Sequence, residues 1–258
     1  TRVRMFKHAT RRGTETEDFG GYLRFGEPRF GDDLLRWSGL GEVIMYRSHD
    51  GFDYAADSSP EALAQAKEIL LPAARNGWTV QVHVFQRDFF EALLGLFEEI
   101  HAEVPIDSLR WAFVHATPLV PEDVPRLQRL GLGVLVQSAN RFNGELFLSY
   151  WGEERVASTP ALRSVLDGDV PLGLGSDGMR AASYNPWASI QHFMPGLTVG
   201  GIPTLRGAHL HSREEALAGY TRDTAWFTFE EHDRGTLTPG MLADLAVLSA
   251  DYFSVPVE

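Results

Sequence analysis

The sequence has no cysteine among its 258 residues. This absence excludes disulfides, zinc sites built from thiolates and catalytic cysteine nucleophiles, and it fits a reducing compartment. No apolar run reaches the ~18 residues that a membrane-spanning helix needs, and no basic-then-apolar leader opens the chain. We therefore expect a cytoplasmic protein with no membrane partner.

Basic residues are also scarce, and they form no block. The 23 lysines and arginines stand against 35 aspartates and glutamates, so the formal net charge is -12. This balance argues against a nucleic-acid partner, which would need a basic surface. A small molecule is the expected partner, and the composition is also compatible with a homo-oligomer. With 44% hydrophobic residues, the chain can bury the core of a single α/β barrel.

Strand-like and helix-like segments alternate from residue 42 onward. Strands are expected near 42–46, 79–85, 109–115, 133–137 and 171–175. Helices are expected over 59–77, 88–103, 120–131, 159–169, 185–194 and 212–229. Repeated β-then-α units predict neighbouring parallel strands joined by right-handed crossovers. These five strands would form most of a barrel wall in an α/β fold.

The end of the chain has a different pattern. RGTLTPGMLADLAVLSAD, residues 234–251, has no helical stripe, turns at Pro239-Gly240 and continues into the strand-like ADLAVLS. We therefore expect a barrel portion over 1–233 and strands of a small β element over 234–258.

Polar side chains stand at the ends of the expected strands. His83 lies near the end of the second strand, His115 ends the third and Asp177 follows the fifth, whereas Glu42 stands at the start of the first. Carboxyl ends of parallel strands converge on the ligand site of such folds. Imidazole and carboxylate are ligands of catalytic zinc, and a carboxylate can also take a proton from bound water. Each residue alone could instead be a hydrogen-bonded structural histidine or a helix-capping aspartate, but together they favour a metal site.

Two further residues follow a strand at the expected mouth. Asn140 and Arg141, in QSANRF, come directly after the strand near 133–137. They are candidates for substrate contact.

Four segments, in order, carry a family resemblance. They are VQVHVFQRDFFEALLGLFEE, RWAFVHATPLVPEDVPRLQRLGLGVLVQSANRF, LGLGSDGMRAASYNPWASI and the closing EEALAGYTRDTAWFTFEEHDRGTLTPGMLADLAVLSADYF. Over about residues 36–255 the chain resembles the amidohydrolase superfamily, within it the YtcJ-like, amidohydrolase-3 group. The resemblance implies strands four to eight of a TIM barrel, with His83 and His115 as metal ligands and Asp177 binding metal and water. It also implies a final segment that returns to a small β-sandwich.

The chain departs from the family pattern at two places. The superfamily carries His-x-His on its first barrel strand, but the spacing occurs here only at His209 and His211, in an expected loop. Together with the opening at Thr1, this predicts a fragment that lacks the amino-terminal half, binds metal weakly or not at all and is inactive alone. Two-metal members also use a carboxylated lysine on the fourth strand, where this chain offers Glu42 instead. Glu42 is thus a candidate ligand. The expected metal is zinc, and the sequence is compatible with either one or two divalent ions.

The resemblance implies a metal-dependent hydrolase that acts on an amide or another C–N bond of a small molecule. In the complete enzyme, Asp177 would accept a proton from metal-bound water, and His115 or a neighbouring residue would stabilise the developing oxyanion. One alternative is a non-catalytic α/β module whose polar groups only hydrogen-bond one another. A phosphate-binding barrel is disfavoured because no glycine-rich turn comes with a lysine.

Overall fold

A computed structural model describes residues 2–178, 181–205, 209–210 and 212–257. The chain divides into two compact units: the first contains residues 1–135 and 168–170, and the second contains 136–167 and 171–258. Within the described ranges, no helix combines the length and the apolar character that a membrane span requires.

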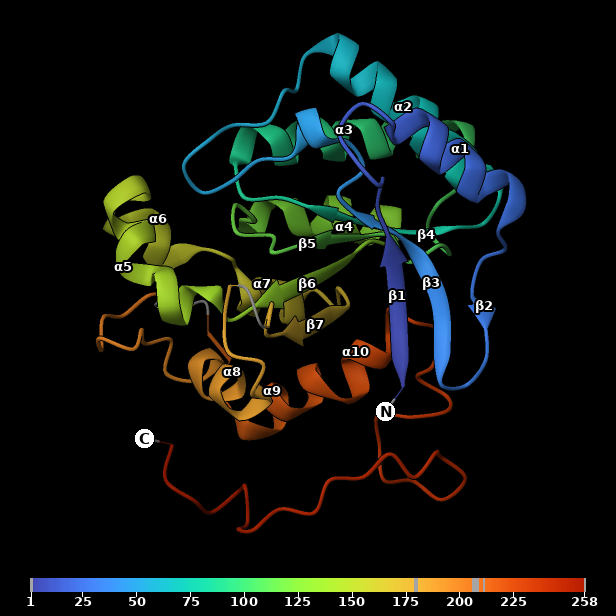
Figure 1. Cartoon of the computed structure of the whole chain (residues 1–258). Coiled ribbons are helices and arrows are strands. Elements are labelled where there is room, and N and C mark those ends of the chain that lie inside the picture. The colour runs from blue at the N-terminus through green and yellow to red at the C-terminus, as the bar shows by residue number, and fades with distance from the viewer. Residues whose placement is uncertain (1, 179–180, 206–208, 211, 258) are drawn as a thin grey trace. The chain divides into compact units, whose positions relative to one another are not determined.

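The first unit is built on a mainly parallel sheet (Figure 1). Its strands are β1 (Val3–Lys7), β2 (Phe30–Gly31), β3 (Leu35–Glu42), β4 (Thr79–His83), β5 (Ala112–Val114) and the start of β6 (Gly133–Gln137). Parallel pairing joins β1 to β3, β3 to β4, β4 to β5 and β5 to β6, while β2 runs antiparallel to β3. This confirms the α/β class and the parallel barrel-type wall.

The first expected strand was placed wrongly. β3 ends at Glu42, whereas the strand was expected to start there, and Tyr46–Ser48 form a short 3₁₀ helix, η1. The apolar Ile44 and Met45 are buried, but they belong to the loop after the strand. The real strand, LRWSGLGE, was missed because glycine is normally depleted in strands. β1 was missed because charged residues interrupt its short apolar pattern.

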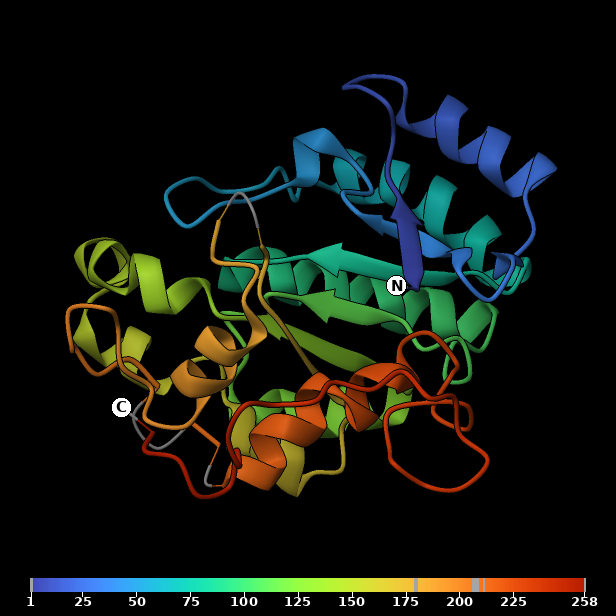
Figure 2. The ribbon, with the colours of Figure 1, turned by 60° about the horizontal axis from the view of Figure 1, so that its bottom comes forward.

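Helices α1 (Glu15–Phe25), α2 (Pro60–Arg75), α3 (Arg87–Glu103) and α4 (Val124–Leu130), with the 3₁₀ helix η2 (Pro121–Asp123), complete the first unit. In Figure 2, α2 and α3 run beside the strands. The Ser59 hydroxyl accepts a hydrogen bond from the Ala62 amide at 3.3 Å and so caps the start of α2, within the helix expected over 59–77. Gly131 follows the last residue of α4, and its left-handed φ of 62° is typical of the residue that caps a helix end.

Aromatic side chains pack α3 against β5, the strand that precedes His115. The ring of Phe97 stacks on that of Phe113 with centroids 5.2 Å apart, and the Phe90 and Phe113 centroids are 4.7 Å apart. The Trp111 indole donates a hydrogen bond to the Trp78 carbonyl at 2.8 Å in the fully buried core. These contacts pack α3 on β5 and join the residues just before β4 and β5, so the amino ends of the two strands are fixed to each other.

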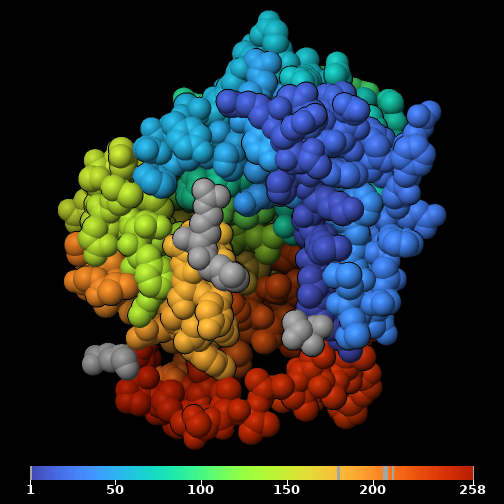
Figure 3. Space-filling view, in the orientation of Figure 1, coloured from blue at the N-terminus to red at the C-terminus, as the bar shows by residue number. Residues whose placement is uncertain are grey.

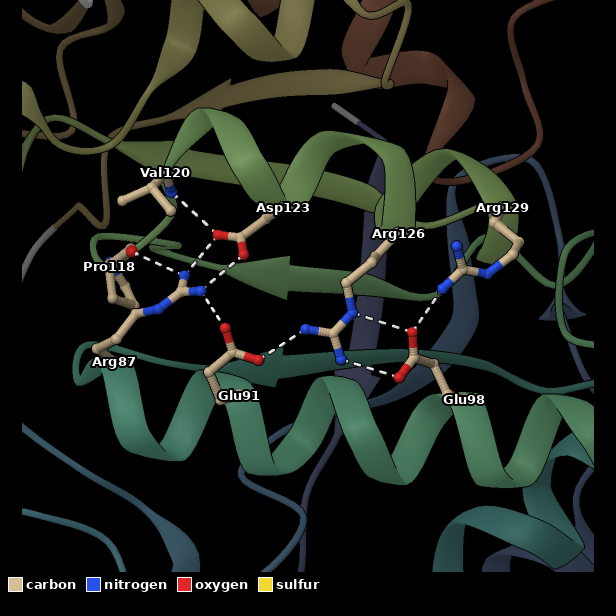
Figure 4. A network of polar contacts seen from close by, with 8 residues as sticks. All are labelled: Arg87, Glu91, Glu98, Pro118, Val120, Asp123, Arg126 and Arg129. Atoms are coloured by element: carbon tan, nitrogen blue, oxygen red, sulfur yellow. Dashed lines mark hydrogen bonds and ion pairs between the residues drawn. The ribbon is translucent and has the colours of Figure 1, made fainter.

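An ion-pair network also joins α3 to η2 and α4 (Figure 4). At one end, the Arg87 guanidinium donates to both carboxylate oxygens of the buried Asp123, at 2.5 and 2.7 Å. At the other end, Glu98 accepts from Arg126 and from the exposed Arg129. The network therefore runs from the loop after β5 to the surface.

In the described residues, the second unit contains the end of β6 together with six helices and one complete strand. They are α5 (Ala139–Trp151), α6 (Glu153–Ser158), α7 (Leu162–Asp167), β7 (Leu172–Gly175), α8 (Pro186–Phe193), α9 (Arg213–Tyr220) and α10 (Arg222–Trp226). The expected helix over 212–229 is thus divided at Thr221. α5 and α6 were not predicted.

The expected strands at the end of the chain are not formed. Residues 235–257, all described, contain neither helix nor strand. Several apolar side chains of this segment are exposed, among them Leu237, Leu245 and Val247, and the red residues lie on the surface in Figure 3. A strand exists only when its backbone groups pair with a neighbour, and no described strand pairs with ADLAVLS. The boundary at 233/234 stays a prediction.

Candidate metal centre

Three predicted site residues of the first unit meet at the ends of adjacent strands. Glu42 ends β3, His83 ends β4 and His115 directly follows β5. One donor atom from each lies within 4.8 Å of the others. Glu42 Oε2 is 3.3 Å from His115 Nε2 and 3.8 Å from His83 Nδ1. These separations match a group of donors around one small ion.

The backbone leaves regular strand geometry where these side chains converge. Glu42 pairs with Val82, the residue before His83, so in a regular pleat Glu42 and His83 would face opposite sides of the sheet. Gly41 has a φ of +125°, and a Cβ atom there would lie 1.9 Å from the Gln81 carbonyl oxygen. Glycine is therefore required at the step that turns the Glu42 side chain.

A second departure occurs at the end of β5. His115 and Ala116 have φ values of +68° and +47°, in the left-handed region that non-glycine residues rarely adopt. Such strained backbone costs about 1–3 kcal/mol per residue and concentrates at functional sites. The strain here coincides with the turn that brings His115 Nε2 to Glu42.

The ring of His83 is held by a hydrogen bond at Nε2, the nitrogen that does not face Glu42. His83 Nε2 lies 2.9 Å from the Asp50 carbonyl oxygen, which can only accept a hydrogen bond. Nε2 therefore donates, and in the neutral ring Nδ1 carries a lone pair. This Nδ1 is buried and has no hydrogen-bond partner. An unpartnered buried nitrogen facing a carboxylate and a second imidazole fits a site that accepts a cation.

The carboxylate of Glu42 supplies negative charge to this cluster. Burial by itself would raise the pKa of Glu42, but the neighbouring His115 and His83 outweigh it and hold that pKa well below its ordinary value. The cluster thus offers one carboxylate and two imidazoles. Two histidines and one glutamate form a ligand set of catalytic zinc sites, so these residues fit a divalent ion.

Asp50 is a site residue that the sequence did not reveal. It is fully buried, and its carboxylate accepts hydrogen bonds from the Phe85 and Gln86 amides. Burial raises the pKa of Asp50, although the Gln86 amide and the charge of His83 oppose that effect. In SHDGFD, this residue resembles an ordinary turn aspartate, so no local signal marked it.

The remaining predicted residues lie in the second unit. Asp177 follows β7 with a φ of +53° and is exposed. Asn140 is buried and Arg141 is partly exposed in the first turn of α5. His209 Nδ1 contacts the Leu205 carbonyl oxygen at 3.0 Å, and His211 lies outside the described residues. The roles expected for Asp177, Asn140 and Arg141 stay predictions.

A parallel α/β sheet with imidazole and carboxylate groups at its strand ends is characteristic of metal-binding barrel proteins. The chain belongs to the amidohydrolase family, whose model matches residues 26–258. This confirms the resemblance on which the sequence interpretation depended.

Solved structures of similar fold include two described as uncharacterized metal-dependent hydrolases. The protein from Pyrococcus horikoshii OT3 is 20% identical with a TM-score of 0.75, and the match covers 99% of this chain and 52% of that one. The protein from Pyrococcus furiosus is 22% identical with a TM-score of 0.70, covering 92% and 50%. A mutant of atrazine chlorohydrolase TrzN from Arthrobacter aurescens TC1, complexed with zinc and atraton, is 17% identical with a TM-score of 0.56, covering 94% and 52%.

A curated relative is "Protein LONG AFTER FAR-RED 3" of Arabidopsis thaliana. It is 28% identical over 198 residues, which are 74% of this chain and 33% of that protein. The chain therefore spans a third of this relative's length and about half the length of the similar structures.

Proposed function

We propose that this protein is a metal-dependent hydrolase of a small molecule and cleaves an amide or another C–N bond. Glu42, His83 and His115 would hold a divalent cation. The observation that carries this proposal is the buried, unpartnered Nδ1 of His83, which lies 3.8 Å from the Glu42 carboxylate. Family membership and the hydrolases of similar fold, one of them complexed with zinc, support it.

Zinc is the proposed ion because nitrogen and oxygen donors in this combination suit it, and three protein ligands are enough for one catalytic ion. A bound divalent cation would lower the pKa of a water molecule toward ~7 and so supply a nucleophile at neutral pH. Glu42 contributes the negative charge that holds the ion. The strained turn at His115 fixes the second imidazole near that carboxylate.

Further roles of this chain's residues are proposed from the family resemblance. Asp177, a solvent-exposed carboxylate after β7, would accept the proton of the attacking water, and His115 would also steady the developing oxyanion. Asn140 and Arg141 would contact the substrate. Hydrolysis is proposed for the natural protein rather than for these 258 residues alone, because the similar structures are about twice as long.

An assay with the natural protein tests the proposal. We would incubate the zinc-loaded protein with a panel of small amides, cyclic amides and triazines and measure release of the amine or acid. The proposal is supported if His83→Ala abolishes the activity and His232→Ala retains it. His232 is the control because its side chain is 90% exposed. Failure to bind zinc together with no hydrolysis of any panel member would contradict it.

A non-catalytic module is the second candidate. One observation favours it, namely the 3.3 Å contact between Glu42 Oε2 and His115 Nε2, which can exist as an ion pair without any metal. Under this alternative, Glu42→Gln would lower stability but zinc would not change the thermal midpoint of the unmodified protein. Under the hydrolase proposal, zinc raises that midpoint because it binds only the folded state.

A further inference from the structure

We propose that Asp50 is a positioning residue of the candidate metal centre. It holds the ring of His83 with the Nε2 proton on the Asp50 carbonyl and with the Nδ1 lone pair toward Glu42 and His115. This inference rests on the proposed metal-dependent function, but it concerns a residue outside the three donors.

The carboxylate of Asp50 accepts hydrogen bonds from the backbone just after His83, and its Oδ1 also lies 3.4 Å from His83 Nε2. The Phe85 amide lies 3.0 Å from each of the two carboxylate oxygens, and the Gln86 amide lies 2.6 Å from Oδ2. These amides come two and three residues after His83. Because Asp50 is fully buried, water does not replace these bonds, and the carboxylate closes the loop that follows β4.

The loop that carries Asp50 also accepts hydrogen bonds from the side chain of Gln86. The Gln86 side-chain amide donates to the Gly51 carbonyl at 2.7 Å and to the Phe52 carbonyl at 3.1 Å. Residues 50–52 and 85–86 therefore hold each other through reciprocal bonds. As a result, the Asp50 carbonyl has a fixed direction toward His83 Nε2.

This fixed carbonyl selects one form of the His83 ring. The other neutral tautomer would place the Nε2 lone pair 2.9 Å from the lone pairs of the Asp50 carbonyl oxygen. It would also place a proton on Nδ1, which could then not bind a cation. Hydrogen-bonding partners of this kind orient ligand histidines, and their removal typically weakens metal affinity about 10- to 100-fold.

The first test measures the ring itself without any metal. Nitrogen-15 NMR of the labelled, metal-free protein, recorded at about pH 8 and above the ordinary imidazole pKa of ~6.5, distinguishes the two tautomers. We expect His83 to carry its proton on Nε2. A predominant Nδ1–H form would overturn the inference, whatever the protein's activity.

The second test measures zinc affinity by calorimetry. Asp50→Asn keeps the side chain's shape but places an amide group against backbone donors, so we expect about 10- to 100-fold weaker zinc binding. Gln86→Ala, a truncation of a partly buried side chain, should shift affinity in the same direction and serves if Asp50→Asn does not fold. Glu230→Gln alters another buried carboxylate, in the second unit, and should leave zinc affinity unchanged.

The outcomes separate the two proposals. Unchanged zinc affinity in Asp50→Asn, or in Gln86→Ala where the first variant is unfolded, contradicts the positioning role while the metal centre stands. An unmodified protein that binds no zinc contradicts the metal centre, and the tautomer measurement then still decides whether Asp50 orients His83.

Discussion

Substituting Asp123 should show how strongly the buried end of the α3–α4 network stabilises the fold. The side chain of Asp123 is 3% exposed, and it accepts two bonds from Arg87 and one from the Val120 amide at 3.0 Å. Asp123→Asn keeps the volume but removes the charge and replaces one acceptor with a donor. Arg87 then keeps Glu91, the Pro118 carbonyl and at most the one amide oxygen of the new side chain as partners.

The expected magnitude follows from the burial of the two partners. Breaking a fully buried ion pair from one side costs about 3–5 kcal/mol. Arg87 is 34% exposed and keeps Glu91, so the cost should be smaller, about 2–3 kcal/mol. Arg129→Ala at the other end of the same network provides the matched control. Its side chain is 58% exposed, and an exposed pair contributes about 0–1 kcal/mol.

Urea unfolding followed by circular dichroism measures both variants. The reasoning predicts a clearly lower midpoint for Asp123→Asn and a nearly unchanged midpoint for Arg129→Ala. Equal effects of the two substitutions would refute the argument that burial decides the contribution of each pair.

Two other substitutions test the second unit and the strand end before Glu42. Burial lowers the pKa of His192 to about 4. The charge of Arg141 also lowers this pKa, whereas the hydrogen bond to the Leu197 carbonyl raises it. Only the unfolded chain then takes up this proton between about pH 6.5 and about pH 4, so stability is present above that window and is lost as the pH falls. Urea unfolding should show that the free energy of unfolding falls by about 1–2 kcal/mol by about pH 5. His192→Gln should remove this pH dependence. The same pH dependence in the variant would contradict the assignment to His192. Gly41→Ala should cost more than about 3 kcal/mol because its Cβ would meet the Gln81 carbonyl, whereas Gly77→Ala, with open space around it, should cost about 1 kcal/mol. Similar losses would show that the close approach at Gly41 is unimportant.

Local signals in the sequence predicted much of the helical framework. The helices expected over 59–77 and 120–131 match α2 and η2 with α4, because helix ends depend on a few neighbouring residues, such as Ser59 before Pro60 at the start of α2. His83 and His115 could be predicted as neighbours because the ends of parallel strands share an edge.

Features that depend on distant pairing could not be predicted in the same way. The glycine-rich β3 and the short β1 gain their strand conformation from neighbouring strands, not from their own propensity. The apolar alternation of ADLAVLS favoured a strand, yet a strand also needs a partner. Asp50 contacts backbone amides 35 and 36 residues away, a relation that no local motif encodes.

The central claim is that Glu42, His83 and His115 hold one divalent ion. A crystal of the zinc-loaded protein, measured at the zinc absorption edge, tests it most directly. The account predicts an anomalous peak ~2.0–2.2 Å from His83 Nδ1, His115 Nε2 and a Glu42 carboxylate oxygen, with His83 Nε2 still bonded to the Asp50 carbonyl. A zinc-loaded protein with no peak at these three residues, or with His83 bound through Nε2, would contradict it.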